Sequence, residues 1–239
     1  MSAAELLAAN VVVAVGSVLQ GSIGFGLGFF AAPLLLLIDA RLVPAPLLLA
    51  SGVLTVLLTH RERDAILVAD LKWALGGRVL GTAAATAVLV SIPGERLGLA
   101  FAAVILLGVV LTAGGWSLTP GPRVLVGAGA LSGFMATTAA IGGPPMALVY
   151  QHESGPRIRA TLSAYFVVGV AVSLVGLGVV GHFGLREATL AGALLPAILM
   201  GFWLSRHTAR WLDRGYVRPT VLVVSAAAAV AVLAKTLSR

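Results

Sequence analysis

The sequence contains no cysteine and few charged residues. The absence of cysteine from all 239 residues excludes disulfides, thiolate metal sites, iron–sulfur clusters and cysteine nucleophiles. Charged residues make up 10% of the chain, whereas globular proteins carry about a quarter. With 59% hydrophobic residues and a mean hydropathy of +1.04, the chain lacks the polar surface that a water-soluble domain needs. The composition therefore predicts a polytopic membrane protein.

Acidic residues are also scarce, and none lies inside an apolar segment. All nine Asp and Glu residues, like the four His residues, fall in polar joints or at segment ends. We therefore expect no carboxylate or imidazole at the bilayer midplane to relay protons or bind a cation. The Gly-x-Ser-x-Gly, His-Glu-x-x-His and P-loop patterns are missing too. These absences predict a protein that is not an enzyme and that has neither a metal site nor a cofactor.

Charged joints divide the chain into eight apolar segments, which predict an all-α fold. A helical span needs about 20 mostly apolar residues. No joint is long enough to hold a soluble domain, and Glu5, with no basic residue ahead of the first apolar run, argues against a cleavable signal peptide. The predicted segments are 6–38, 42–59, 73–94, 97–119, 124–150, 160–181, 188–205 and 219–234.

Two of these segments, 6–38 and 124–150, have the wrong length for a single span. The first has 33 uncharged positions, about 50 Å of helix against a hydrocarbon core of about 30 Å. Glycine and proline interrupt both segments in the middle, and each glycine weakens a helix by about 1 kcal/mol. We therefore expect each long segment to be a broken helix or a re-entrant hairpin.

The two halves of the chain align at an offset of 112 residues. The aligned pairs are Gly21 with Gly133, Pro33 with Pro145, Pro44 with Pro156 and Ser51 with Ser163. This alignment predicts two transmembrane repeats, 1–119 and 120–239, of about four segments each, within one integral membrane domain. The alternative is that glycine and proline are simply frequent in membrane helices.

The basic residues predict how the repeats are oriented. The excess of 16 Lys and Arg over 9 Asp and Glu indicates cytoplasmic membrane anchors rather than a nucleic-acid surface. If the two long segments enter and return, ten basic residues share one side and five lie on the other, whereas simple crossings give seven against eight. The re-entrant topology places Arg61 and Arg210 together in the cytoplasm and makes the two repeats inverted, as in many secondary transporters.

The glycine-rich breaks are the candidate substrate site. At a helix break the first amides have no intrahelical acceptor and the helix dipole is positive, so the backbone can bind an anion. The alternative is that the glycines serve helix packing, which suits Gly129-x-x-x-Gly133 well. The candidate substrate-binding residues are Gln20, Gly21, Ser22, Gly24, Phe25, Gly26, Thr137, Thr138, Gly142, Gly143 and Pro144.

Arg78 is the single charge inside an apolar segment. It lies six residues after Lys72, about 9 Å deeper, so its side chain could reach back to the membrane surface as an anchor. We favour this anchor, and the alternative is a vestibule that attracts anions. Arg157 and Arg159 are likewise expected to be anchors at the start of the sixth segment.

These motifs resemble the sulfite exporter TauE/SafE family along essentially the whole chain. The resemblance rests on Gly21-x-x-Gly24-Phe25-Gly26-x-Gly28 followed by Pro33, and on Gly129-x-x-x-Gly133 followed by Gly142-Gly143-Pro144. It implies a transporter of sulfite, sulfoacetate, sulfonates or other organic anions in a bacterial or archaeal inner membrane, which the chain would cross several times.

The expected partners follow from this function. They are a small anionic substrate held between the two broken helices, membrane lipid, and Na+ or H+ as a coupling ion, because backbone carbonyls at unwound helices can bind a cation. A homo-oligomer is compatible with the sequence, and no nucleic acid is expected. Two alternatives stay open, namely a membrane scaffold that transports nothing and an anion channel.

Overall fold

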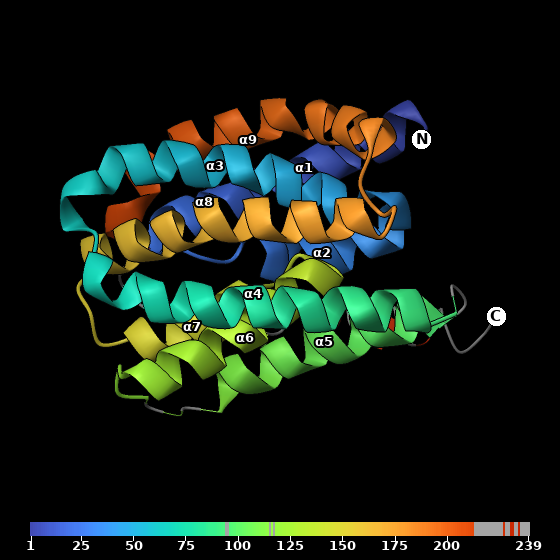
Figure 1. The fold of residues 1–239 in the computed structure, drawn as a ribbon. Coiled ribbons are helices and arrows are strands. Elements are labelled where there is room, and N and C mark those ends of the chain that lie inside the picture. Colours follow the sequence, from blue (N-terminus) through green and yellow to red (C-terminus); the bar gives the residue numbers. More distant parts are fainter. Residues whose placement is uncertain are drawn as a thin grey trace.

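The protein is a bundle of roughly aligned helices (Figure 1). The computed structural model describes residues 1–93, 96–114, 116, 118–212, 227, 230, 231 and 234. Within that part of the chain the structure is all-helical, without strands. The elements are α1 (Ala3–Ile23), α2 (Leu27–Ile38), η1 (Ala40–Leu42), α3 (Ala45–Glu62), η2 (Arg63–Ala65), α4 (Val68–Ser91), α5 (Leu97–Ala113), α6 (Pro122–Ala139), α7 (Gly143–Tyr150), α8 (Gly155–Val179) and α9 (Leu185–Leu212).

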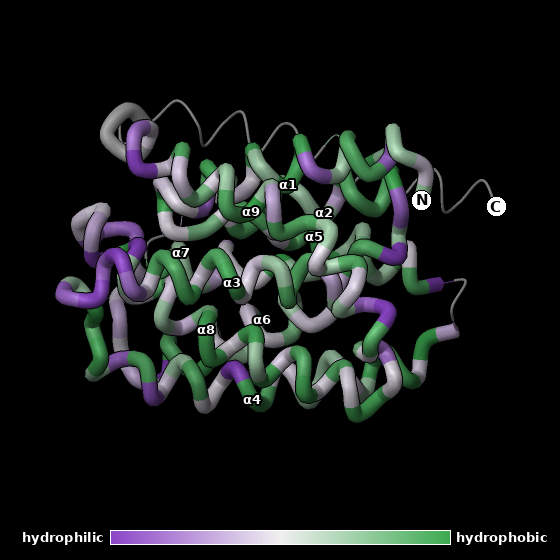
Figure 2. Tube along the Cα trace, turned by 90° about the horizontal axis from the view of Figure 1, so that it is seen from above, coloured by the Kyte–Doolittle hydropathy of each residue, from purple (hydrophilic) through white to green (hydrophobic). Residues whose placement is uncertain are grey.

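Length and hydropathy allow four of the described helices, α1, α4, α8 and α9, to cross a membrane, and α2 and α5 are shorter apolar helices. In Figure 2 hydrophilic stretches gather at the two ends of the bundle, while its middle is largely hydrophobic. The predicted all-α membrane fold is therefore confirmed for the described residues. The predicted segment 219–234 lies outside them, apart from the isolated positions 227, 230, 231 and 234.

Several helices begin or end beyond the predicted boundaries. The fourth segment-like helix, α4, begins at Val68 rather than at residue 73, and α8 begins at Gly155 rather than at residue 160. The predicted boundaries were placed at charged residues, which mark where a chain leaves the hydrocarbon. The backbone continues to form helical hydrogen bonds into the polar region, so α4 includes Lys72 and α8 includes Arg157.

Polar side chains begin and end helices at the ends of the bundle. Ser2 and Glu5 form a capping box at the start of α1, in which each side chain bonds the backbone amide of the other residue, at 3.2 and 2.7 Å. Asp39 ends α2 and accepts the backbone amide of Arg41 at 3.0 Å. The Arg41 guanidinium also bonds this carboxylate and holds the pKa of Asp39 below its usual value.

The first long segment forms a helical hairpin, α1–α2. The chain turns at Gly24 and Gly26, whose φ angles of 101° and 128° lie in the left-handed region that favours glycine. Gly16 then lies against Leu27, because a Cβ added at Gly16 would lie 3.3 Å from the Cα of Leu27. In a continuous helix these residues would be about 16 Å apart. The segment is therefore broken, and α2 folds back along α1.

The second long segment forms a matching hairpin, α6–α7. Here Ala140 takes the left-handed conformation, with a φ of 60°, after α6 ends. The Ser132 hydroxyl donates to the carbonyl of Gly142 at 2.6 Å, although the two residues are ten positions apart. In Figure 1 the first hairpin starts at the right and the second at the left. The broken form of both segments is thus observed, and the inverted repeat stays a prediction.

Small residues bring the two halves into close contact. The pairs Gly77/Gly81 on α4 and Gly129/Gly133 on α6 face each other, and a Cβ at any of them would overlap or crowd the backbone of the other helix. The structure therefore confirms the packing interpretation of Gly129-x-x-x-Gly133.

An equivalent contact joins α1 to α9. Ser17 and Gly21 on α1 lie against Gly201 and Ser205 on α9. Ser17 and Gly21 align with Gly129 and Gly133 at the offset of 112 residues that relates the halves in sequence. Each hairpin therefore packs on the last long helix of the other half, and α3 packs on α8 between them.

The α4–α6 contact predicts that Gly81→Ala destabilises the protein. The added methyl group would overlap the carbonyl of Ala130, so the helices must separate at a cost of about 1–3 kcal/mol. The matched control is Gly76→Ala on the same helix, where the methyl group meets nothing within 4 Å. Thermal unfolding of the purified protein should show a lower melting temperature for Gly81→Ala alone. Equal melting temperatures would contradict the close contact.

The re-entrant topology predicts which joints share a side of the membrane. Arg61 is half-buried, so we choose the more exposed Arg63 and Arg157, together with Arg186 from the other end of the bundle. The chain has no native cysteine, so a single Cys at each position can be labelled with an impermeant maleimide. Positions 63 and 157 should react from the same side and position 186 from the opposite side. Reaction of 63 and 157 from opposite sides would restore simple crossings and separate Arg61 from Arg210.

Candidate functional site

The breaks of the two hairpins meet inside the bundle. Gly28, at the start of α2, packs so closely on the second break that a Cβ there would overlap the carbonyl oxygen of Ala140. A Cβ at Gly143, the first residue of α7, would lie 2.9 Å from the ring of Phe25. Only glycine allows this approach at both positions. The contact brings residues from both halves of the chain around one shared space.

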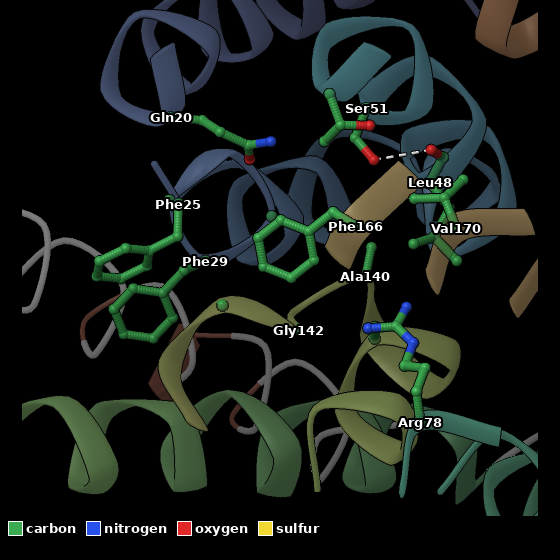
Figure 3. A pocket seen from close by; sticks show the side chains of 15 residues that line it. Gln20, Phe25, Phe29, Leu48, Ser51, Arg78, Ala140, Gly142, Phe166 and Val170 are labelled. Carbon is green, nitrogen blue, oxygen red and sulfur yellow. Dashed lines mark hydrogen bonds between the residues drawn. The ribbon is translucent and has the colours of Figure 1, made fainter. Parts of the chain in front are cut away.

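That space is a cavity of about 40 Å³, which we call the polar cavity (Figure 3). A cavity of about 10–15 Å³ holds one water molecule, so this one has room for a group of a few heavy atoms. It is lined by residues from both hairpins and from α3, α4 and α8. They are Gln20, Phe25, Gly26, Gly28, Phe29, Leu48, Ser51, Thr55, Arg78, Ala136, Ala140, Gly142, Gly143, Phe166 and Val170.

Arg78 reaches the polar cavity from α4 and is 1% exposed. Its Nη1 donates to the hydroxyl of Ser132 at 3.2 Å, and its Nη2 donates to the carbonyl of Gly169 and the hydroxyl of Ser173 at 2.9 and 3.0 Å. In Figure 3 the guanidinium points from α4 toward Ala140. The charged end of the side chain therefore lies among α6 and α8 and not at the membrane surface.

The expectation that Arg78 is a membrane anchor is therefore wrong. The side chain would need to extend along α4 toward Lys72, but α4 packs against α6 through glycine and leaves room on its inner face instead. Gly169 on α8 adds to that room, because a Cβ there would lie 2.8 Å from Cζ of Arg78. The guanidinium fills the space that these missing side chains leave.

No carboxylate neutralises Arg78 within the described residues. The ion pairs there involve Arg41, Arg61, Arg63, Arg157 and Arg159, and none includes Arg78. Its neutral partners leave Nε without a hydrogen-bond partner among the described residues. A buried unpaired charge costs several kcal/mol, because its hydration is lost without compensation. Hence this part of the cavity has both a charge and a donor for an anion.

Five predicted site residues line the polar cavity: Gln20, Phe25, Gly26, Gly142 and Gly143. Pro144 lies in the apolar cavity next to it, which Phe25 and Gly26 also line. The amide donors at the second break are fewer than expected, because the first turn of α7 contains Pro144 and Pro145, which have no N–H. At the first break, the Gln20 side-chain oxygen accepts the amide of Leu27 at 3.3 Å.

The other five predicted site residues do not line the polar cavity. Gly21 and Ser22 face α9, where the Ser22 hydroxyl lies 2.9 Å from that of Thr208. Gly24 packs against the backbone of Arg159. The Thr137 hydroxyl donates to Thr82 and Ser173, at 3.2 and 2.8 Å. The buried hydroxyl of Thr138 has no hydrogen-bond partner among the described residues.

The sequence analysis missed the lining residues of α3 and α8. Ser51, Thr55, Phe166 and Val170 lie in ordinary apolar helices, without a charge or glycine cluster to mark them. The available signal was the alignment of Ser51 with Ser163 between the halves. For Arg78, the signal was its place between Gly77 and Gly81, since a glycine face indicates that a helix side is buried against another helix.

Comparison with known proteins agrees with this arrangement. The family described as sulfite exporter TauE/SafE matches residues 8–232, nearly the whole chain. The chain belongs to this family. Membership implies a membrane transporter of sulfur-containing anions, in a family of transporters and not of enzymes. No curated protein and no solved structure matches the chain.

A second charged cluster in this TauE/SafE protein holds the end of α1 beside the first break. Arg159 is 8% exposed, bonds the carboxylate of Glu62 at 3.1 Å and donates to the carbonyl of Ser22 at 3.3 Å. Arg61 lies 3.4 Å from the same carboxylate and donates to the carbonyl of Gly21 at 2.6 Å. The expectation that Arg159 is a surface anchor is therefore wrong, because its charge is paired inside the bundle.

This cluster predicts that Glu62→Gln destabilises the protein. The substitution removes the one carboxylate that two half-buried or buried guanidinium groups share, at an expected cost of about 1–3 kcal/mol. Asp64→Asn is the matched control, because the Arg63–Asp64 pair is exposed and such pairs contribute little. The melting temperature should fall for Glu62→Gln and stay unchanged for Asp64→Asn. Similar small shifts in both variants would show that the cluster does not hold α1.

Proposed function

We propose that this TauE/SafE protein is a secondary transporter that binds a small sulfur oxyanion, such as sulfite or a sulfonate, against Arg78 in the polar cavity. The observation that carries the proposal is a buried guanidinium without a carboxylate, with its Nε free of partners among the described residues. An anion in the cavity would supply the missing charge and accept the free N–H. Guanidinium groups suit this task because their planar donors match the geometry of oxyanions.

Other donors around the cavity support the same ligand. The oxygen of the Gln20 amide accepts from Leu27, which leaves the amide nitrogen as the donor to the cavity. Ser51 and Thr55 add hydroxyl groups, and Gly143 adds the first amide of α7. The polar cavity of about 40 Å³ suits a sulfonate-sized head group. The site therefore combines one positive charge with neutral donors, as expected for a monoanion.

The position of the cavity supports alternating access. It lies where the two hairpins touch, and each hairpin packs mainly on the opposite half of the chain. Movement of the hairpins relative to α3 and α8 would open the cavity to one side of the membrane and close it to the other, as in transporters built from two repeats with broken helices. Na+ or H+ as the coupling ion belongs to the same proposal.

The charge distribution supports the inner membrane as the location. In the re-entrant topology ten basic residues, including Arg61, Arg157 and Arg159, share one side and five lie on the other. The side rich in Lys and Arg is the cytoplasmic one in inner-membrane proteins. The cluster around Glu62 would then face the cytoplasmic half of the bundle.

The decisive test is substitution of Arg78. Sulfite at 100 times its dissociation constant should stabilise the wild-type protein by about 2.7 kcal/mol and so raise its melting temperature. Arg78→Gln should weaken binding at least about tenfold, because a charge-assisted contact is lost, and should abolish uptake into reconstituted vesicles. Arg78→Lys, which keeps the charge but not the fork of donors, should retain part of both.

Lys72→Gln is the control for this test, since it removes an exposed cation from the same helix. It should bind and transport as the wild-type protein does. Full binding and uptake by folded Arg78→Gln would refute the site. A wild-type protein that ignores sulfite, thiosulfate and small sulfonates alike would instead favour a membrane scaffold.

A further inference from the structure

A second and larger cavity adjoins the polar cavity. It has a volume of about 220 Å³, more than five times that of its neighbour, and we call it the apolar cavity. It lies between α1, α2, α5, α7 and α8. Its lining residues include Leu19, Ile23, Phe25, Phe29, Ala147 and Leu148.

The two cavities share three lining residues, Phe25, Gly26 and Phe29. In Figure 3 the rings of Phe25 and Phe29 lie next to each other on the side of the polar cavity away from Arg78. Gly26, between the two phenylalanines in sequence, contributes no side chain to this boundary. A molecule bound at Arg78 can therefore extend past the two rings into the apolar cavity.

The chemistry of the apolar cavity is opposite to that of the polar cavity. Among its described lining residues, Thr112 and Gln151 alone carry polar side chains. The Thr112 hydroxyl bonds the carbonyl of Gly108 at 2.8 Å, and the Gln151 amide bonds the carbonyl of Trp116 at 2.7 Å. No charged residue lines it within the described chain. The cavity thus offers surface for hydrocarbon and no charge for a second acid group.

We propose, on the basis of the function proposed above, that the substrate is an organic sulfonate with a single charge and an apolar body. Its sulfonate binds Arg78 in the polar cavity, and its body passes Phe25 and Phe29 into the apolar cavity. An apolar cavity of about 150 Å³ binds benzene, so 220 Å³ accommodates a phenyl group or a short alkyl chain. Inorganic sulfite fills the polar cavity alone and leaves the larger space unused.

The test is a homologous series of ligands on the full-length protein in lipid nanodiscs. Binding of methane-, ethane-, propane- and butanesulfonate is measured by calorimetry. Because each methylene buried contributes about 0.8 kcal/mol, affinity should rise about fourfold per methylene, or roughly 60-fold over the series. Butanol, with the same body and no sulfonate, should not bind measurably.

Ala147→Phe assigns this gain to the apolar cavity. The new ring fills space beside Leu148 and Pro144, so butanesulfonate should bind within about threefold of methanesulfonate, whose own affinity should not change. Val110→Phe is the control, because Val110 is 53% exposed on α5 and does not line either cavity. If Ala147→Phe does not fold, Ala147→Leu repeats the test with a smaller side chain.

The outcomes separate this inference from the function on which it rests. An affinity that depends on Arg78 but not on chain length would overturn the apolar-body substrate and leave the anion site intact. A gain with chain length that persists in Ala147→Phe would also overturn it, because the body would then partition into lipid. If no sulfonate and no sulfite binds, the proposed anion site itself fails.

Discussion

The structure depends on one positive charge that has no carboxylate partner inside the bundle. A guanidinium in an apolar interior is costly unless neighbouring groups replace its lost hydration. Ser132, Ser173 and the carbonyl of Gly169 do so in part, and Nε stays unsatisfied among the described residues. The incomplete compensation is what makes the cavity beside Arg78 selective for anions. A nearby Asp or Glu would stabilise the empty protein and remove that selectivity.

Glycine makes this arrangement sterically feasible. Gly77 and Gly81 flank Arg78 in sequence and bring α4 against α6, while Gly169 leaves room for the guanidinium itself. Gly28 and Gly143 let the two hairpin breaks approach each other. The glycines therefore act mainly through packing, and the charge acts on the ligand. The two interpretations of the glycine motifs, packing and binding, describe parts of one design.

Much of the fold could be predicted from the sequence, because its signals are local. Runs of apolar residues gave the helices, and Gly24, Gly26 and the Gly142–Pro145 stretch gave the breaks. The lining of the cavity was harder to predict. Ser51, Thr55 and Phe166 are ordinary members of apolar helices, and only tertiary packing brings them to the site. Arg78 was misinterpreted for the same reason, since its depth along α4 says nothing about which way the side chain turns.

The exchange of partners between the halves also constrains how the chain is made. The small-residue face of α1, at Ser17 and Gly21, packs on Gly201 and Ser205, which are synthesised about 180 residues later. Until α9 is inserted, that face has no protein partner from its final structure and meets lipid or the insertion machinery. Such distant contacts are slow to form, because most of the chain must be in place first. A ribosome that stops after the first half would therefore leave α1 and α4 in the membrane with their closest-packing surfaces uncovered.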